Sequence, residues 1–236
     1  MKKLLVLIPI LFYSLLCSAQ KYEYPILPGT PEWQKLEGYQ DMLKACQIPE
    51  DKLKSMNTDE LLQTCLDFPI SISFYAFDNM YEGVDNLTPN FNGLRELLDR
   101  KDNVLSLYRL LIKVNIDDLI SNKYLSKREK GKQITRIALI ETFLTLPEIL
   151  HNMTNDQAEI IIDKVYDNLV KKEMNKEYFS KYSLESSALL LGEGLNKVTE
   201  TSSITRDYKS ILRSGKILNQ ETLIYLKKHY KSIRFN

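Results

Sequence analysis

The side chains best suited to metal or acid–base chemistry are few in this sequence. The 236 residues include two histidines, His151 and His229, and neither belongs to an H-E-x-x-H pattern. That spacing is the one that places two imidazoles on one helix face for zinc. His151 stands in "EILHNMT", at the predicted end of a helix, where an imidazole interacts favourably with free carbonyl groups. We therefore predict no metal site, no bound cofactor and no catalytic histidine.

The sequence also lacks the motifs that indicate a catalytic nucleophile or a phosphate-binding loop. The sequence has no G-x-S-x-G turn for a serine nucleophile, and the "GEG" at 192–194 is too short to cradle a phosphate. Acidic pairs such as Asp117-Asp118 are common, but neighbours in sequence do not define two carboxylates across a sugar ring. A carboxylate-dependent glycosidase of the cell envelope therefore stays open as the enzymatic alternative, without named catalytic residues.

Cys46 and Cys65 are the cysteines that follow the N-terminal apolar run. In an oxidising compartment they could form a disulfide, which would add about 3 kcal/mol by the chain-entropy model. They could equally pack as two buried thiols that behave as small hydrophobic side chains. Neither cysteine has a histidine nearby in sequence, so a thiol nucleophile is not predicted.

The N-terminus has the pattern of a secretory signal peptide. Lys2 and Lys3 precede an apolar run from Leu4 to Leu16, and the small residues Cys17-Ser18-Ala19 follow. The run of about thirteen residues is too short for a membrane-spanning helix, which needs about twenty. We predict a signal peptide over 1–19 and an exported bacterial protein, periplasmic or extracellular. Lipid attachment at Cys17 is the less favoured alternative, because the preceding Leu16 is bulky.

Helix-start signals recur along the rest of the chain. Thr30 precedes a proline at the first helical position, and Pro49 repeats that logic. "SKRE" at Ser126 and "TNDQ" at Thr154 are capping boxes, and Ser183 is predicted as a further cap. Apolar residues recur between these signals at intervals of three and four, which is typical of amphipathic helices.

One stretch resembles a strand. "ISISFYAF" (70–77) alternates between apolar and polar residues at first. We predict the start of a helix there, because no hairpin turn bounds the stretch. The sequence therefore predicts an all-α protein in which 20–236 form a single helical domain.

A nine-residue pattern recurs in the predicted helices. "LLQTCLDFP" begins at Leu61 and "LIETFLTLP" at Leu139, with weaker copies, "LESSALLLG" at Leu184 and "LSLYRLLIK" at Leu105. Intervals near forty residues are typical of two-helix repeats of the armadillo or HEAT kind. We predict an irregular α-solenoid of stacked helix pairs, with a globular helical bundle as the alternative.

Basic residues gather in one part of an otherwise balanced chain. Without the predicted signal peptide, 30 basic and 31 acidic side chains remain, which gives a net charge of −1 and no electrostatic case for nucleic-acid binding. The stretch 123–136 nevertheless contains Lys127, Arg128, Lys130 and Lys132 with a single acidic residue. These side chains form either an ordinary solvated helix face or a surface for an acidic partner.

A resemblance points to the same compartment. The stretch "QIPEDKLKSMNTDELLQTCLDFP" (47–69), with "YPILPGTPEW" before it and "NFNGLRELLDRKD" (90–102) after it, resembles a set of secreted helical proteins of Bacteroidetes-like bacteria. The resemblance implies export and helices. It implies no activity, so it assigns no site residue.

Surface recognition is the function that these observations favour. Tyr75 and Tyr81 belong to an aromatic-rich stretch and could lie exposed in a groove, where tyrosine often makes contacts. Together with Lys127, Arg128, Lys130 and Lys132 they form the predicted interaction surface. We predict an exported, non-catalytic interaction module that binds a protein or glycan partner and has no transmembrane span.

Overall fold

All the regular secondary structure that the protein shows is helical. The computed structural model describes residues 21–199 and 220–235, and no strand occurs within those ranges. The prediction of an all-α fold is therefore confirmed. The predicted signal peptide over 1–19, with Cys17, lies outside the described residues.

The helices of the N-terminal half are short. They are α1 (Pro31–Gln34), α2 (Tyr39–Ala45), α3 (Glu50–Ser55), α4 (Thr58–Leu66), α5 (Met80–Leu87) and α6 (Asn92–Asp99), with 3₁₀ turns at Ser71–Ala76 and Thr88–Asn90. The second half contains longer helices. They are α7 (Asn103–Ile112), α8 (Ile116–Ser121), α9 (Lys127–Phe143), α10 (Pro147–Asn152), α11 (Asn155–Met174), α12 (Lys181–Thr199) and α14 (Gln220–Arg234).

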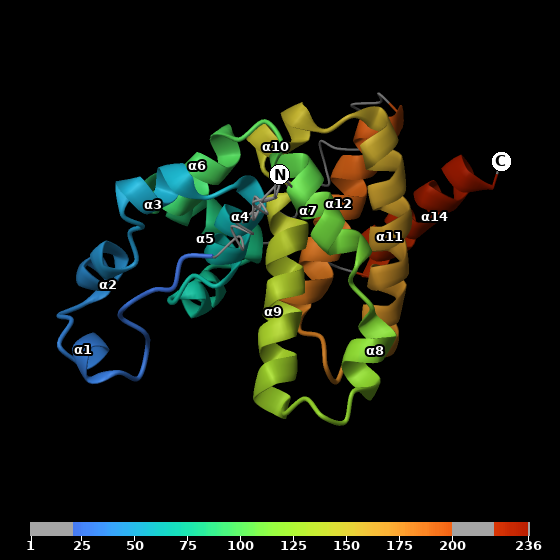
Figure 1. The fold of residues 1–236 in the computed structure, drawn as a ribbon. Helices are drawn as coiled ribbons and strands as arrows, with labels where there is room; N and C mark the ends of the chain where they lie inside the picture. Colours follow the sequence, from blue (N-terminus) through green and yellow to red (C-terminus); the bar gives the residue numbers. More distant parts are fainter. Residues whose placement is uncertain (1–20, 200–219, 236) are drawn as a thin grey trace, which may run out of the picture.

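Three long helices form the centre of the fold, and the other helices pack around them (Figure 1). α9, α11 and α12 stand side by side, with α1 to α6 on one side of them and α14 on the other (Figure 1). The helix α14 is fastened to α11 by polar contacts. Lys227 pairs with Glu173 at 2.8 Å, and Tyr230 and Arg234 both contact Asp163, at 2.9 and 2.7 Å.

The predicted helix starts agree with the structure at most positions. Thr30 caps α1, and the capping boxes at Ser126 and Thr154 are both complete. Pro49 stands one residue before α3 rather than inside it. The prediction for Ser183 is wrong, because Ser183 lies inside α12 and is buried.

The strand-like stretch "ISISFYAF" forms a 3₁₀ turn over Ser71–Ala76. This is helical, as predicted, but tighter than an α-helix. Only Phe74 of the turn is buried. A short turn with one buried anchor has no full amphipathic face, which explains why the sequence shows no helical period there.

A close approach between α11 and α12 explains the "GEG" segment. A Cβ atom added at Gly194 would overlap Cγ2 of Ile162 on α11. Any larger side chain at 194 would therefore force these two helices apart. The absence of a side chain at Gly194 therefore permits the close packing of α11 and α12.

Across the part of the chain that the structure describes, no helix is both long and apolar enough to cross a lipid bilayer.

Candidate functional site

A charged pair lies in the interior, between the three long helices. Lys172 Nζ of α11 is 2.7 Å from Glu141 Oε2 of α9, and both side chains have 0% exposure. Lys172 also donates to Ser187 Oγ at 2.9 Å and to the Ser183 carbonyl at 3.2 Å, both on α12. Ser187 Oγ donates in turn to Glu141 Oε2 at 2.9 Å. One lysine thus connects α9, α11 and α12.

An amide completes this buried group. Asn168 lies one helical turn before Lys172 on α11, and its Nδ2 is 3.4 Å from Glu141 Oε1. The Oδ1 atom of Asn168 is buried without a hydrogen-bond partner. A buried amide oxygen in this state is uncommon, since buried polar atoms are nearly always satisfied. We call Glu141, Lys172, Asn168 and Ser187 the buried polar centre.

Burial also changes the chemistry of Lys172. Removal from water disfavours the ammonium form and lowers the pKa of Lys172, while the Glu141 carboxylate opposes that shift. The Phe179 ring lies 5.9 Å from Nζ and adds a cation–π contact. The buried polar centre is closed to solvent, so a dissolved substrate has no access to it.

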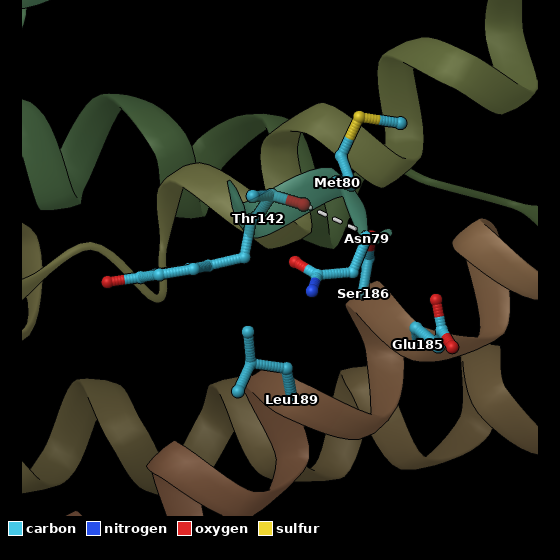
Figure 2. Close-up of a pocket in the computed structure, with 7 residues that line it drawn as sticks. Asn79, Met80, Thr142, Glu185, Ser186 and Leu189 are labelled. Atoms are coloured by element: carbon cyan, nitrogen blue, oxygen red, sulfur yellow. Dashed lines mark hydrogen bonds between the residues drawn. The ribbon is translucent and has the colours of Figure 1, made fainter. Parts of the chain in front are cut away.

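A small hollow lies between the start of α5 and the neighbouring faces of α9 and α12. Figure 2 shows its lining, in which Thr142 Oγ1 and Ser186 Oγ are hydrogen-bonded at 3.1 Å. The hollow has a cavity volume of about 10 Å³, which is room for about one water molecule, and Asn79 and Glu185 contribute polar groups to its lining. A glycosidase needs two carboxyl groups around the bond that it cleaves. Glu185 is the carboxylate that this lining supplies.

Cys46 and Cys65 are free, buried thiols in the structure. Burial raises the pKa of Cys46 to about 12 and raises the pKa of Cys65 further. Both thiols also help to raise the pKa of Tyr24, so all three groups lie in one region of the core. Such thiols pack as hydrophobic side chains and are poor nucleophiles.

The two predicted surface tyrosines are both partly buried against the main core. Tyr75 shares a hydrogen bond of 2.9 Å with Thr135 of α9, and its ring meets Tyr182 edge-on at 5.1 Å. Tyr81 lines the small hollow. The structure therefore packs Tyr75 against Thr135 of α9 and places Tyr81 in the lining of the hollow.

Most of the predicted basic side chains do reach solvent. Lys127, Arg128 and Lys132 are exposed in the first turns of α9. Lys130 is different, because it donates to the Ile120 carbonyl at 2.5 Å and lies 5.8 Å from the Tyr178 ring. Lys130 thus ties the start of α9 to the chain that follows α11.

Two tyrosines that the sequence analysis did not select lie in this region. Tyr124, in the loop before α9, is 99% exposed, and Tyr178, in the loop after α11, is 42% exposed. These loops lie at the same end of the molecule, at the bottom of the view (Figure 1). Their signal in the sequence was weak, because a tyrosine in a loop has no periodic pattern that indicates its exposure.

We call this region the cationic end. It consists of the exposed side chains Lys123, Tyr124, Lys127, Arg128, Lys132 and Tyr178. A smaller apolar cluster, formed by Ile116, Ile137 and Phe179, lies beneath it and is separate from the main core. The apolar cluster and Lys130 hold the two loops in place under the exposed groups.

Within 21–199 and 220–235, no group of three or more His, Cys, Asp or Glu side chains is arranged to hold a metal ion. No protein-family model, curated protein or solved structure matches this chain.

Proposed function

We propose that this protein is an exported, non-catalytic interaction module, and that the cationic end binds an acidic partner. The partner is a negatively charged glycan or an acidic segment of a protein. Export is proposed from the signal-peptide pattern of 1–19. Binding is proposed from the exposed cations and tyrosines of the cationic end.

The position of these cations on α9 is the observation that carries the proposal. The N-terminus of a helix has a partial positive charge, so cations there cost about 0.3–1 kcal/mol each. Lys127 and Arg128 occupy the first two positions of α9, and Glu129 is the acidic residue of that turn. Exposed cations at such a position make the local potential more positive, which attracts anions.

The two tyrosines add a second kind of contact. Tyr124 has almost all of its surface available, and a tyrosine ring offers a large rigid face together with a hydroxyl group. Arginine and lysine bind carboxylates and similar anions, with arginine able to form paired hydrogen bonds. An acidic sugar or an acidic peptide would use both kinds of group.

The proposed α-solenoid arrangement gains support from equivalent contacts in two of the repeats. Gln63 and Glu141 hold the same position in the nine-residue pattern. Gln63 accepts a hydrogen bond from Arg136 of α9, and Glu141 accepts one from Lys172 of α11. In both cases a basic residue of a later helix reaches the same position of the pattern.

The next residue of the pattern also behaves alike. Thr64, Thr142 and Ser187 are all buried, and the hydroxyl groups of Thr64 and Thr142 donate to the carbonyl four residues earlier, at 2.9 and 2.8 Å. The copy that begins at Leu105 differs from the others, because Leu105 itself is exposed, whereas Leu61 and Leu139 are buried. Stacked helix pairs commonly present extended binding surfaces, which agrees with the proposed function.

The experiment measures retention on three immobilised polymers at low salt. Polygalacturonate serves as the acidic glycan, poly-glutamate as the acidic polypeptide and dextran as the neutral control. We expect retention on at least one acidic polymer, none on dextran, and loss of retention as salt rises. Equal retention on dextran, or no retention on either acidic polymer, would contradict the proposal.

A charge-reversed variant locates the binding. Retention should be abolished by the combined substitutions Lys127→Glu, Arg128→Glu and Lys132→Glu. This variant should fold, because acidic residues near the start of α9 stabilise the helix. The matched control reverses Lys35, Lys52 and Lys101, which are exposed elsewhere. The control should retain most of the binding. Equal losses in both variants would show that net charge alone, not the cationic end, is responsible.

A further inference from the structure

We propose that Lys172 and Asn168 become joined by an intramolecular isopeptide bond, with Glu141 as the proton-transfer group. The proposal concerns a covalent modification of the interior and does not depend on the proposed binding function. Its basis is the buried polar centre, where an amine, an amide and a carboxylate meet without solvent.

The three groups meet at the carboxylate of Glu141. Lys172 and Asn168 are four residues apart on α11, so their Cβ atoms are neighbours at about 5–6 Å. Both side chains also turn toward the same carboxylate, at 2.7 Å from Nζ to Oε2 and 3.4 Å from Nδ2 to Oε1. Reactants held together in this way avoid the entropy cost of meeting in solution.

The surroundings favour a reactive amine. A buried ion pair has a large desolvation cost, so transfer of one proton from Lys172 to Glu141 replaces two buried charges by two neutral groups. Burial lowers the pKa of Lys172, in the direction that assists this transfer. Lysine that is desolvated becomes a nucleophile for carbonyl groups.

The amide oxygen of Asn168 is the second favourable feature. Oδ1 is buried and has no hydrogen-bond partner. The two ends of an asparagine amide are assigned from its hydrogen bonds, so rotation by half a turn brings Oδ1 to Glu141 in place of Nδ2. Protonated Glu141 would then donate to Oδ1 and polarise the carbonyl group that Lys172 attacks.

The atoms and charges of the step balance. Glu141 takes one proton from the ammonium of Lys172, and the neutral Nζ forms a bond to Cγ of Asn168. The Cγ–Nδ2 bond breaks, and a second proton from Nζ passes to Nδ2 through Glu141. One ammonia molecule leaves, a neutral amide links the two side chains, and Glu141 remains protonated. No oxidant, reductant or co-reactant is needed.

Peptide mass spectrometry of the folded, full-length exported protein tests the proposal. Trypsin should release VYDNLVK (165–171) joined to KEMNK (172–176), lighter than their sum by one ammonia. The unmodified protein would instead give separate VYDNLVK and EMNK peptides, and finding these as the main products would overturn the proposal. Whole-protein mass is not sufficient, because cyclisation of an N-terminal Gln20 also releases ammonia.

Matched variants identify the groups. Lys172→Arg should remove the joined peptide, whereas Lys171→Arg, at an adjacent position on a more exposed face, should leave it unchanged. A cyclic imide at Asn168 also loses ammonia, but it would persist in Lys172→Arg and would not link two peptides. Glu141→Gln should slow formation by about 100-fold or more, as loss of a general acid–base group does. Unchanged formation in Glu141→Gln would exclude the proposed role of Glu141.

Discussion

Glu141 Oε2 lies 2.7 Å from Lys172 Nζ, and neither side chain is reached by solvent. Lysine and glutamate are almost never fully buried unless they are paired. Removal of one member therefore leaves an uncompensated charge in the interior, which is more harmful than removal of both.

Glu141→Gln leaves the Lys172 ammonium in the interior without its carboxylate partner, and breaking a buried pair in this way costs about 3–5 kcal/mol. The double variant Glu141→Gln/Lys172→Met should be more stable than Glu141→Gln alone, since the unpaired charge is then absent. Urea unfolding of the two variants measures the difference. The double variant has no lysine at 172 and cannot form the proposed isopeptide bond, and Glu141→Gln forms it slowly, so both variants are compared soon after refolding. A double variant less stable than Glu141→Gln would contradict the pairing.

Two glycines should respond in opposite directions to alanine. Gly194→Ala should destabilise the protein by about 1–3 kcal/mol, because the added methyl group overlaps Ile162 across the α11–α12 contact. Gly131→Ala should stabilise it by about 0.5–1 kcal/mol, because Gly131 lies in α9 with nothing within 4 Å of the new Cβ. Thermal unfolding of both variants tests the packing. A neutral Gly194→Ala would show that the two helices do not touch there.

The thiols of Cys46 and Cys65 should react with an alkylating reagent only after unfolding. At pH 8 the raised pKa of Cys46, about 12, leaves a thiolate fraction roughly a thousandfold smaller than that of an ordinary cysteine. In a chain that begins at Gln20 and so lacks Cys17, we expect two reactive thiols in denaturant without reductant. If neither Cys46 nor Cys65 reacts in denaturant, the two cysteines form a disulfide, which is one of the two interpretations of the sequence.

The same shifts predict how stability changes at high pH. The folded-state pKa values of Cys46 and Cys65 are raised above the value of about 8.5 for an unfolded chain. Their contribution is therefore complete below pH 8.5 and is lost as the pH rises toward the folded-state values. Urea unfolding at pH 7 and pH 10 should show a lower free energy of unfolding at pH 10. In a Cys46→Ala/Cys65→Ala variant that decrease should be smaller. An equal decrease in the variant would contradict the assignment to the thiols.

Local features of the fold could be predicted from the sequence, because they depend on neighbouring residues. The capping boxes at Ser126 and Thr154 use side chains three positions apart, and both are present. Ser183 failed as a cap because packing against other helices decides its place, and its carbonyl accepts from Lys172. A single helix start cannot reveal such a partner.

The buried polar centre left a signal that could have been followed. On α11, Asn168 and Lys172 lie three and seven residues after the buried Val165, so the helical period places all three on one face. A lysine in that register is the unusual feature. Its partner could not be predicted, since Glu141 is 31 residues away and belongs to another helix.

The exposure of three basic side chains followed from the sequence, whereas the environment of Tyr75 and Lys130 did not. The charges of Lys127, Arg128 and Lys132 are local in sequence, and they are exposed. The environment of Tyr75 depends on Thr135, 60 residues away, so its partial burial had no local signal. Lys130 likewise depends on the non-local ring of Tyr178.

The most direct test of the proposed function is to map the bound acidic ligand by amide chemical shifts in ¹⁵N-labelled protein. Oligogalacturonate and oligo-glutamate are titrated separately at low salt. The account predicts saturable shifts at 122–133 and 174–179, and their loss in the Lys127→Glu/Arg128→Glu/Lys132→Glu variant. Shifts centred instead on the hollow lined by Asn79, Glu185 and Ser186, or shifts that persist in that variant, would contradict binding by the cationic end.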